Sequence, residues 1–458
     1  MQFDYVVIGG GPGAAISAVR ASQLGKRVAL VDRRAAGALP IEEDRARLQA
    51  ILRSAEVYET LKKSGAYGIR SQGLSHEMPT IVDRGRGLAR RISSGVEYLL
   101  KKNKVTCYSG QASLMSANQV RVEGEEPLEA QSIAIACETK PVVPTGFRID
   151  GERVLSLHEA VRLNDLPERL AIWGDEAEAV EMAYAFRALG SEVKLLVPRS
   201  RLLPDEDHDI ADEVKRAFTR KGIEIETGIT LEQAQPQSNA LLLTYQADGV
   251  NRQIACDAVV LAHGETPQLQ GLGLEALGMA VEDDGLPVNL FQQTSISNIY
   301  AFGPAAQSVQ ENLAEAQGKL AAEHLTGKEP APIDPHQVPV CTMCRPQAAR
   351  LGHTEASAKA QGVGYQTGQF DFRSNPGALL SGESEGRVKL LFDEEHSALI
   401  GAHIVGGEAV EMIQQLQLAL TLEATAEELA RGVYGPATRT EAIREAALDV
   451  LGERIYGA

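Results

Sequence analysis

The 458-residue sequence predicts an α/β fold with two parallel sheets and a smaller α+β domain at the C-terminus. The first sheet is indicated by a strand-like apolar run, Phe3 to Gly9, and an Ala-rich amphipathic stretch, Gly13 to Leu24. A second strand, Arg27 to Val31, follows. This β-α-β order implies parallel strands joined by a right-handed crossover.

The same order of elements returns near the middle of the chain. Leu170 to Trp173 is predicted as a strand, Ala177 to Leu189 as a helix and Glu192 to Val197 as a strand. Two copies of one β-α-β unit, about 165 residues apart, indicate two domains of the same kind.

The pattern changes beyond Lys328 to Pro339, a segment with four prolines that we predict to be a linker. Strands are expected at Val388 to Phe392 and Ser397 to Val405, and helices at Glu408 to Leu422 and Thr440 to Leu451. Strands and helices in separate runs are typical of an α+β domain.

The charge and composition exclude several kinds of partner. A formal net charge of −17 argues against nucleic acid and anionic membranes, because both bind basic surfaces. No run approaches 18 uninterrupted apolar residues, so we expect no membrane-spanning helix. The opening residues show no signal-peptide pattern, and five cysteines are too few for a disulfide scaffold. We therefore expect a cytoplasmic protein.

The turn after the first strand reads Gly9-Gly10-Gly11-Pro12-Gly13-Ala14. It fits the G-x-G-x-x-A pattern of a Rossmann-like, dinucleotide-binding fold. Gly9 allows a tight turn, Gly11 lets the backbone approach a pyrophosphate, and Ala14 permits close packing of helix and strand. The helix N-terminus beyond it supplies amide donors for phosphates. Asp32, 21 residues after Gly11, ends the second strand, where a carboxylate can bind an adenosine ribose.

With these features the chain resembles the pyridine nucleotide-disulfide oxidoreductases, the family of lipoamide dehydrogenase, soluble transhydrogenase and mercuric reductase. The resemblance covers nearly the whole length, including the segments 94–97, 101–105, 257–261, 299–303 and 399–406. It implies FAD in the first fold, NAD(P)H in the second and a homodimer formed through the C-terminal domain.

The resemblance also implies domain boundaries and cofactor contacts. We expect an FAD-binding domain at 1–150 and 276–330, an NAD(P)-binding-like domain at 151–275 and a dimerisation domain at 336–458. The candidate FAD-binding residues are Gly9, Gly11, Pro12, Gly13, Ala14, Asp32 and Gly303.

The first departure from the family concerns the redox disulfide. The family carries C-x4-C after the second strand, whereas this chain has Ala35 to Arg45 there and no cysteine between Met1 and Thr106. Without a thiolate beside the flavin we expect no disulfide reduction.

The second departure is the catalytic His-Glu dyad near the C-terminus. The family's His-x-Pro-Thr-x-Ser-Glu is Val433 to Glu441 here, and no histidine follows His403. A general base near neutral pH is therefore missing. We expect Glu441 to serve the helix dipole, and Tyr434 to pack rather than act as an acid.

The third departure lies in the second fold, where G-x-G-x-x-G-x-E reads Gly174 to Glu181 and keeps one glycine of three. Three carboxylates, those of Asp175, Glu176 and Glu178, fall where a pyrophosphate would bind. Arg199 and Arg201 follow the next strand, where NADP-dependent members carry basic residues, and we interpret them as a solvated surface pair.

Two changes concern the FAD site itself. The family's Ala-Thr-Gly turn is Ala136-Cys137-Glu138, and its Gly-Asp, whose carboxylate binds the ribitol, is Gly303-Pro304. Proline offers neither an N–H nor a side-chain acceptor. Each change would weaken flavin binding by about 1–2 kcal/mol, and we still expect FAD.

The C-terminal domain begins with a C-x-x-C, Cys341-Thr342-Met343-Cys344, which by resemblance lies on a strand near the flavin. Three interpretations stay open: Cys341 and Cys344 as a catalytic redox pair, Cys341 as a single flavin-facing thiol, or simple packing. In a regular strand, residues i and i+3 lie about 10 Å apart on opposite faces, and a disulfide needs Cα atoms within about 7 Å. Metal binding would need more soft ligands than the neighbourhood offers, so no metal is expected.

The leading hypothesis is an FAD-dependent oxidoreductase whose electrons come from a donor other than NAD(P)H, such as a protein, a flavin or a quinone. One alternative is a catalytically retired homologue that acts as a binding or assembly subunit. The other is an atypical NAD(P)H oxidase.

Overall fold

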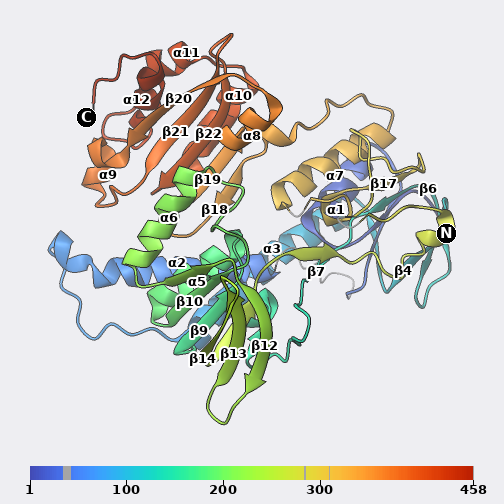
Figure 1. Ribbon diagram of the computed structural model, residues 1–458. Coiled ribbons are helices and arrows are strands. Elements are labelled where there is room, and N and C mark those ends of the chain that lie inside the picture. The colour runs from blue at the N-terminus through green and yellow to red at the C-terminus, as the bar shows by residue number, and fades with distance from the viewer. Residues whose placement is uncertain (35–42, 283–284, 309, 457–458) are drawn as a thin grey trace. The chain divides into compact units, whose positions relative to one another are not determined.

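The computed structural model describes residues 1–34, 43–282, 285–308 and 310–456, which form two compact units (Figure 1). Unit 1 comprises residues 1–47, 83–142 and 264–334, and unit 2 comprises residues 48–82, 143–263 and 335–458. Residues 35–42, in the stretch that replaces the family's C-x4-C, lie outside the described residues.

Unit 1 is built around a sheet with the strand order β3-β2-β1-β6-β5-β4, to which β17 is added beside β6. The parallel strands are β1 (Gln2–Ile8), β2 (Val28–Asp32), β3 (Thr106–Ser109), β6 (Leu128–Ile135) and β17 (Ile299–Ala301). An antiparallel edge is formed by β4 (Ala112–Ser116) and β5 (Gln119–Val122), and β7 (Thr139–Pro141) pairs with β16 (Glu265–Pro267). The predicted parallel α/β architecture is confirmed.

Helix α1 (Pro12–Gln23) follows β1 and crosses α7 (Glu311–Leu325) at close range. A Cβ atom added to Gly13 would lie 2.6 Å from the carbonyl oxygen of Ala314, and one added to Gly318 would lie 2.3 Å from that of Gly13. The two glycines therefore allow the backbones of the helices to touch. Helices α2 (Glu43–Lys62) and α3 (Met78–Lys102) lie between β2 and β3 in the sequence.

The described residues of unit 2 form three sheets. The first is parallel, with the order β11-β10-β9-β15-β8. Its strands are β8 (Val154–Leu155), β9 (Arg169–Trp173), β10 (Glu192–Val197), β11 (Glu224–Thr227) and β15 (Ala258–Leu261). Its helices are α4 (Leu157–Ala160), α5 (Ala177–Leu189) and α6 (His208–Arg220). An antiparallel sheet is formed by β12 (Thr230–Pro236), β13 (Leu241–Ala247) and β14 (Val250–Cys256).

The third sheet belongs to the C-terminal part of unit 2 and is antiparallel, with the order β18-β19-β22-β21-β20. Its strands are β18 (Val340–Thr342), β19 (Gln347–Gly352), β20 (Tyr365–Asp371), β21 (Arg387–Asp393) and β22 (Leu399–Gly406). Its helices are α8 (Glu355–Gln361), α9 (Pro376–Leu380), α10 (Ala409–Thr421), α11 (Ala426–Arg431) and α12 (Glu441–Val450). No helix among the described residues is long and apolar enough to cross a membrane.

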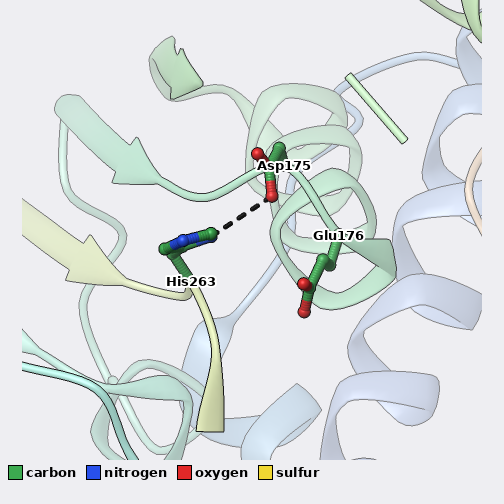
Figure 2. A group of neighbouring side chains, drawn as sticks. All are labelled: Asp175, Glu176 and His263. Atoms are coloured by element: carbon green, nitrogen blue, oxygen red, sulfur yellow. Dashed lines mark hydrogen bonds and ion pairs between the residues drawn. The ribbon is translucent and has the colours of Figure 1, made fainter. Parts of the chain in front are cut away.

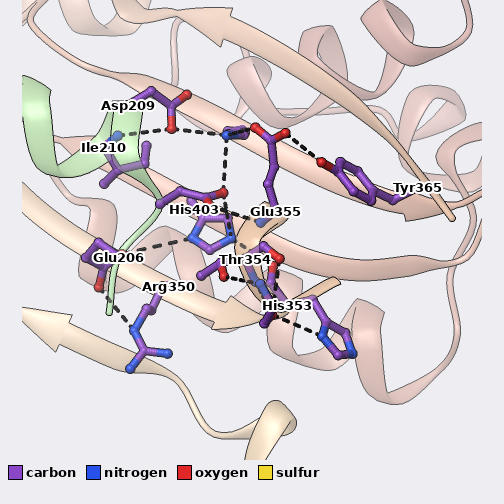
Figure 3. A network of polar contacts seen from close by, with 12 residues as sticks. Glu206, Asp209, Ile210, Arg350, His353, Thr354, Glu355, Tyr365 and His403 are labelled. Atoms are coloured by element: carbon purple, nitrogen blue, oxygen red, sulfur yellow. Dashed lines mark hydrogen bonds and ion pairs between the residues drawn. The ribbon is translucent and has the colours of Figure 1, made fainter. Parts of the chain in front are cut away.

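A buried polar network joins the start of α6 to this C-terminal sheet (Figure 3). Lys389 on β21 is only 2% exposed, and its Nζ lies 3.2 Å from Asp207, 3.0 Å from Asp209 and 2.6 Å from Glu355. Beside it, Nε2 of the buried His403 lies 3.5 Å from Asp207. Buried charges persist only when they are paired, so these contacts hold α6 against the sheet.

Candidate functional site

The glycine turn after β1 is closed by protein on one side and open on the other. Gly9 has a φ of +132°, and a Cβ there would lie 1.9 Å from the carbonyl oxygen of Ala136. A Cβ on Gly10 would lie 1.8 Å from Oδ2 of Asp32, whereas one on Gly11 would meet nothing within 4 Å. Only Gly11 therefore faces open space, at the residue that caps α1.

Asp32 at the end of β2 lines the cleft beside this turn, together with Gly110, Gln111 and Glu138. Its side chain is largely buried. Oδ1 accepts a hydrogen bond from the backbone N–H of Arg34 at 3.2 Å, while Oδ2 is buried without a hydrogen-bond partner. Buried carboxylate oxygens are normally satisfied, and a ribose hydroxyl in the cleft would satisfy this one.

These features fit the adenosine and pyrophosphate part of FAD. The N-terminus of α1 has proline at its first position and no side-chain cap, so its amide donors remain available for phosphate. FAD bound here would supply the hydride and electron chemistry, and Gly11 and Asp32 would hold it.

Glu138 and Pro304, the two positions of the FAD site that depart from the family's pattern, have different surroundings. Glu138 forms an ion pair with Arg34, so its charge is compensated within unit 1. Gly303 adopts a φ of +63°, and its N–H donates to Oε1 of Gln317 at 2.9 Å. Pro304 follows it and offers no carboxylate to a ribitol.

In the second nucleotide-like fold, the loop between β9 and α5 is held by an ion pair. Asp175 is fully buried, and Arg199 donates from Nε to Oδ2 at 2.8 Å and from Nη2 to Oδ1 at 2.7 Å. His263 lies 3.2 Å from Oδ1 through Nδ1 (Figure 2). Burial alone would raise the pKa of Asp175, but hydrogen bonds from Arg199 and His263 hold it well below its ordinary range.

Glu176, which caps α5, contacts the same arginine. Its Oε1 accepts from Nη2 of Arg199 at 2.8 Å, and Glu178 adds a further carboxylate in the first turn. Burial raises the pKa of Glu176 against the opposing effect of Arg199. The helix N-terminus that would receive a pyrophosphate is thus surrounded by the protein's own carboxylates.

The interpretation of Arg199 and Arg201 as a solvated surface pair is incomplete: Arg199 is exposed, but both side chains bind neighbouring residues. Arg199 holds Asp175 and Glu176, and Arg201 donates to the carbonyl of Pro204. The reason lies in the sheet: β9 and β10 are adjacent parallel strands, so the residues that follow them meet at one edge. The loops that follow adjacent parallel strands lie at one edge of the sheet, and these two loops carry opposite charges. Together these two facts could have predicted the pairing of Arg199 with Asp175.

Asp175, Glu176 and His263 could in principle bind a metal, because their ligand atoms lie within 4.8 Å of one another. Both carboxylate oxygens of Asp175, however, accept hydrogen bonds from Arg199. The guanidinium therefore provides the positive charge that a metal ion would otherwise supply.

The C-x-x-C does not lie on one regular strand, because β18 ends at Thr342. Cys344 is fully buried, its Sγ lies 2.9 Å from the carbonyl of Pro346, and burial raises its pKa. Cys341 is half-buried and packs against the separate core of the C-terminal sheet. These surroundings favour packing for Cys344, while a catalytic role for either thiol stays a prediction.

The model of the pyridine nucleotide-disulphide oxidoreductase family matches residues 3–319, and that of the family's dimerisation domain matches residues 338–447. The chain belongs to this family. Among curated relatives, it is 34% identical over 462 residues to a dihydrolipoyl dehydrogenase of Zymomonas mobilis, covering 99% of both chains. It is 31% identical over 470 residues to that of Bacillus subtilis, again covering 99% of both.

Solved structures show the same fold. LpdA from Mycobacterium tuberculosis aligns with a TM-score of 0.90 at 24% identity, over 97% of this chain and 98% of the other. The HOCl-induced flavoprotein disulfide reductase RclA from Escherichia coli aligns with a TM-score of 0.85 at 22% identity, over 97% and 99%.

This member of the pyridine nucleotide-disulphide oxidoreductases is an FAD-dependent oxidoreductase with the family's dimerisation domain, as the resemblance implied. In that domain Tyr434 is partly buried, donates its hydroxyl hydrogen to the carbonyl of Leu429 at 3.2 Å, and has a pKa raised by burial. Glu441 is the first residue of α12. Both placements agree with structural roles, which stay predictions.

Proposed function

We propose that the flavin of this oxidoreductase is reduced by a donor other than NAD(P)H and that the protein is not a disulfide reductase. The observation that carries the proposal is the ion pair of the fully buried Asp175 with Arg199 at the start of α5. A dinucleotide can be held against a flavin only if its pyrophosphate is anchored, and this loop would have to rearrange to anchor one.

Electrostatics favour the same conclusion. A carboxylate about 5 Å from a phosphate repels it by roughly 3 kcal/mol at an effective dielectric near 20. Arg199 offsets one such charge, and it is shared between the two carboxylates of Asp175 and Glu176. A pyrophosphate would also compete with a bidentate carboxylate for the same guanidinium.

The activity in the relatives' name, dihydrolipoyl dehydrogenase, requires a thiolate that exchanges with a disulfide. The first cysteine in this chain is Cys107, and burial raises its pKa. Cys344 is fully buried with a raised pKa, which disfavours its thiolate. Neither Cys107 nor Cys344 therefore supports dithiol exchange. A protein, flavin or quinone donor fits better.

The test is anaerobic stopped flow at the flavin absorption band, with each nucleotide at about 1 mM, the upper range of ordinary KM values. We expect no bleaching within about a second, the scale of an ordinary turnover, while photoreduction bleaches the flavin fully. Bleaching on that scale by NADH or NADPH would instead make the protein an atypical NAD(P)H oxidase.

A matched pair of variants sharpens the test. Glu176→Gly combined with Ala179→Gly restores the family's glycines and should speed reduction by NAD(P)H. The control is Glu395→Gly in an exposed turn of the C-terminal sheet, which should change nothing. A photoreduced flavin that transfers electrons to no protein, flavin or quinone acceptor would favour the retired homologue.

A further inference from the structure

Four arginines converge on one cavity of unit 2, of about 370 Å³. The lining residues are Glu213, Arg216, Arg220, Asp371, Arg373, Gly386 and Arg387. Four guanidinium groups and two carboxylates line it, and Glu385 pairs with one of the arginines, which leaves an excess of one positive charge in a chain whose formal net charge is −17. Cations gathered in this way attract an anionic ligand.

Three separate elements bring the arginines together. Arg216 and Arg220 are four residues apart on α6 and therefore share one face of that helix. Arg373 lies in the short 3-10 helix Phe372–Ser374 that follows β20, and Arg387 is the first residue of β21. The buried network around Lys389 holds α6 to the same sheet, so the two sides of the cavity are fixed to each other.

The acidic neighbours leave most of the arginine donors unused. Arg216 contacts Glu213 at 2.6 Å, and Arg220 contacts Glu385 at 3.0 Å. Nε of Arg387 lies 3.4 Å from Asp371 and is buried without a hydrogen bond. Nη1 of Arg387 also donates to Oε1 of Gln369 at 3.1 Å. Each guanidinium has five N–H donors, so these contacts satisfy only a part of them.

Arg373 is the most available of the four. It is exposed, and among the described residues it makes no hydrogen bond or ion pair. An arginine at a cavity wall with no protein partner is a donor for a ligand, and the planar guanidinium matches phosphate oxygens in pairs.

We propose that this cavity binds a compact polyanion with two or more phosphate groups, such as pyrophosphate or a phosphorylated polyol. The volume lies in the range of small-molecule sites, which is about 300–1,000 Å³. None of the described residues that line the cavity has an aromatic or aliphatic side chain, so the cavity offers no apolar surface for an acyl chain. The ligand is therefore recognised by charge and by hydrogen bonds alone.

The test is calorimetric titration of the FAD-saturated protein with pyrophosphate in a phosphate-free buffer. Saturation with FAD keeps the start of α1 occupied, so the titration reports a different site. We expect binding that weakens as the salt concentration rises, because both partners are charged. Absence of binding at millimolar pyrophosphate would overturn the proposal.

Two variants locate the binding. Arg373→Ala removes a side chain without a protein partner, so folding should be unaffected, and affinity should fall about tenfold, the loss of one charge-assisted hydrogen bond. Arg220→Gln should weaken binding similarly. The control is Arg431→Ala on α11, an exposed arginine outside the cavity, with unchanged affinity expected. Pyrophosphate affinity that is equal in all three variants and the parent protein would contradict the assignment.

Discussion

Arg199 holds the fully buried carboxylate of Asp175 through two hydrogen bonds, one to each oxygen, at 2.7 and 2.8 Å. A buried carboxylate cannot remain charged without such a partner. The pair therefore stabilises the loop after β9 in one conformation, and the same pair makes this loop unlike a phosphate-binding turn.

Removing Arg199 should destabilise unit 2. We expect Arg199→Ala to lower the free energy of unfolding by about 3 kcal/mol, the low end for a broken buried pair, because Arg199 is partly exposed and His263 remains. Urea denaturation measures the change. The exposed Arg148→Ala serves as the control, and Asp175→Asn added to Arg199→Ala should recover part of the loss.

The network around Lys389 predicts a defined acid sensitivity. The hydrogen bond from Lys389, acting against burial, lowers the pKa of Glu355 from 4.5 to about 2. A lowered pKa in the folded state means that Glu355 stabilises the fold above pH 4.5 and that this contribution disappears as the pH falls towards 2.

We therefore expect Glu355→Gln to be less stable than the parent protein at neutral pH, and the difference to shrink between pH 4.5 and 2. Thermal unfolding across this range measures it, with the exposed Glu395→Gln as the control. A difference that stays constant with pH would show that the carboxylate charge of Glu355 contributes nothing.

The open space at Gly11 predicts that a larger side chain there prevents FAD binding without disturbing the fold. Because a Cβ there meets no protein atom within 4 Å, Gly11→Val should fold, yet its side chain would take the place of the pyrophosphate. We expect the variant to purify without flavin absorbance and with native circular dichroism. Gly87→Val on α3, where a Cβ also meets nothing, should keep its FAD.

The exposed leucines at the C-terminal end of helix α10 predict a homodimer. Ile413 and Leu416 are fully buried in the core, whereas Leu418 and Leu422, at and just beyond the end of the helix, are 59% and 69% exposed. A permanent interface buries more than about 2,000 Å² and needs such apolar side chains. Light scattering should show a dimer at micromolar concentration. Leu418→Glu with Leu422→Glu should weaken it, and Val250→Glu on β14 should not.

The pattern of apolar residues within a single segment was sufficient to predict helices and strands whose residues are consecutive. The helix Ala177–Leu189 and the strand Glu192–Val197 have the predicted bounds, because their apolar residues recur with the periods of a helix and a buried strand. The glycine turn at Gly9 was predictable for the same reason, since its strand, turn and helix are consecutive.

Contacts between distant segments could not be predicted in this way. Arg199 and Asp175 are 24 residues apart, and the pairing depends on the order of β9 and β10 in the sheet. The arginine cavity needs α6 beside β20 and β21, which lie more than 140 residues further along the chain. The C-x-x-C was treated as one strand because no sequence signal marked the end of β18 at Thr342.

The contact of Gly13 with α7 also governs when the FAD site can form during protein synthesis. The 305 positions between Gly13 and Gly318 take about 15 to 60 s to translate at about 5–20 residues per second. Until then, the helix that follows the glycine turn emerges from the ribosome without the surface that its small residues fit. We therefore expect the FAD site to form only after more than two-thirds of the chain has been synthesised, and a chain truncated before α7 to bind no FAD.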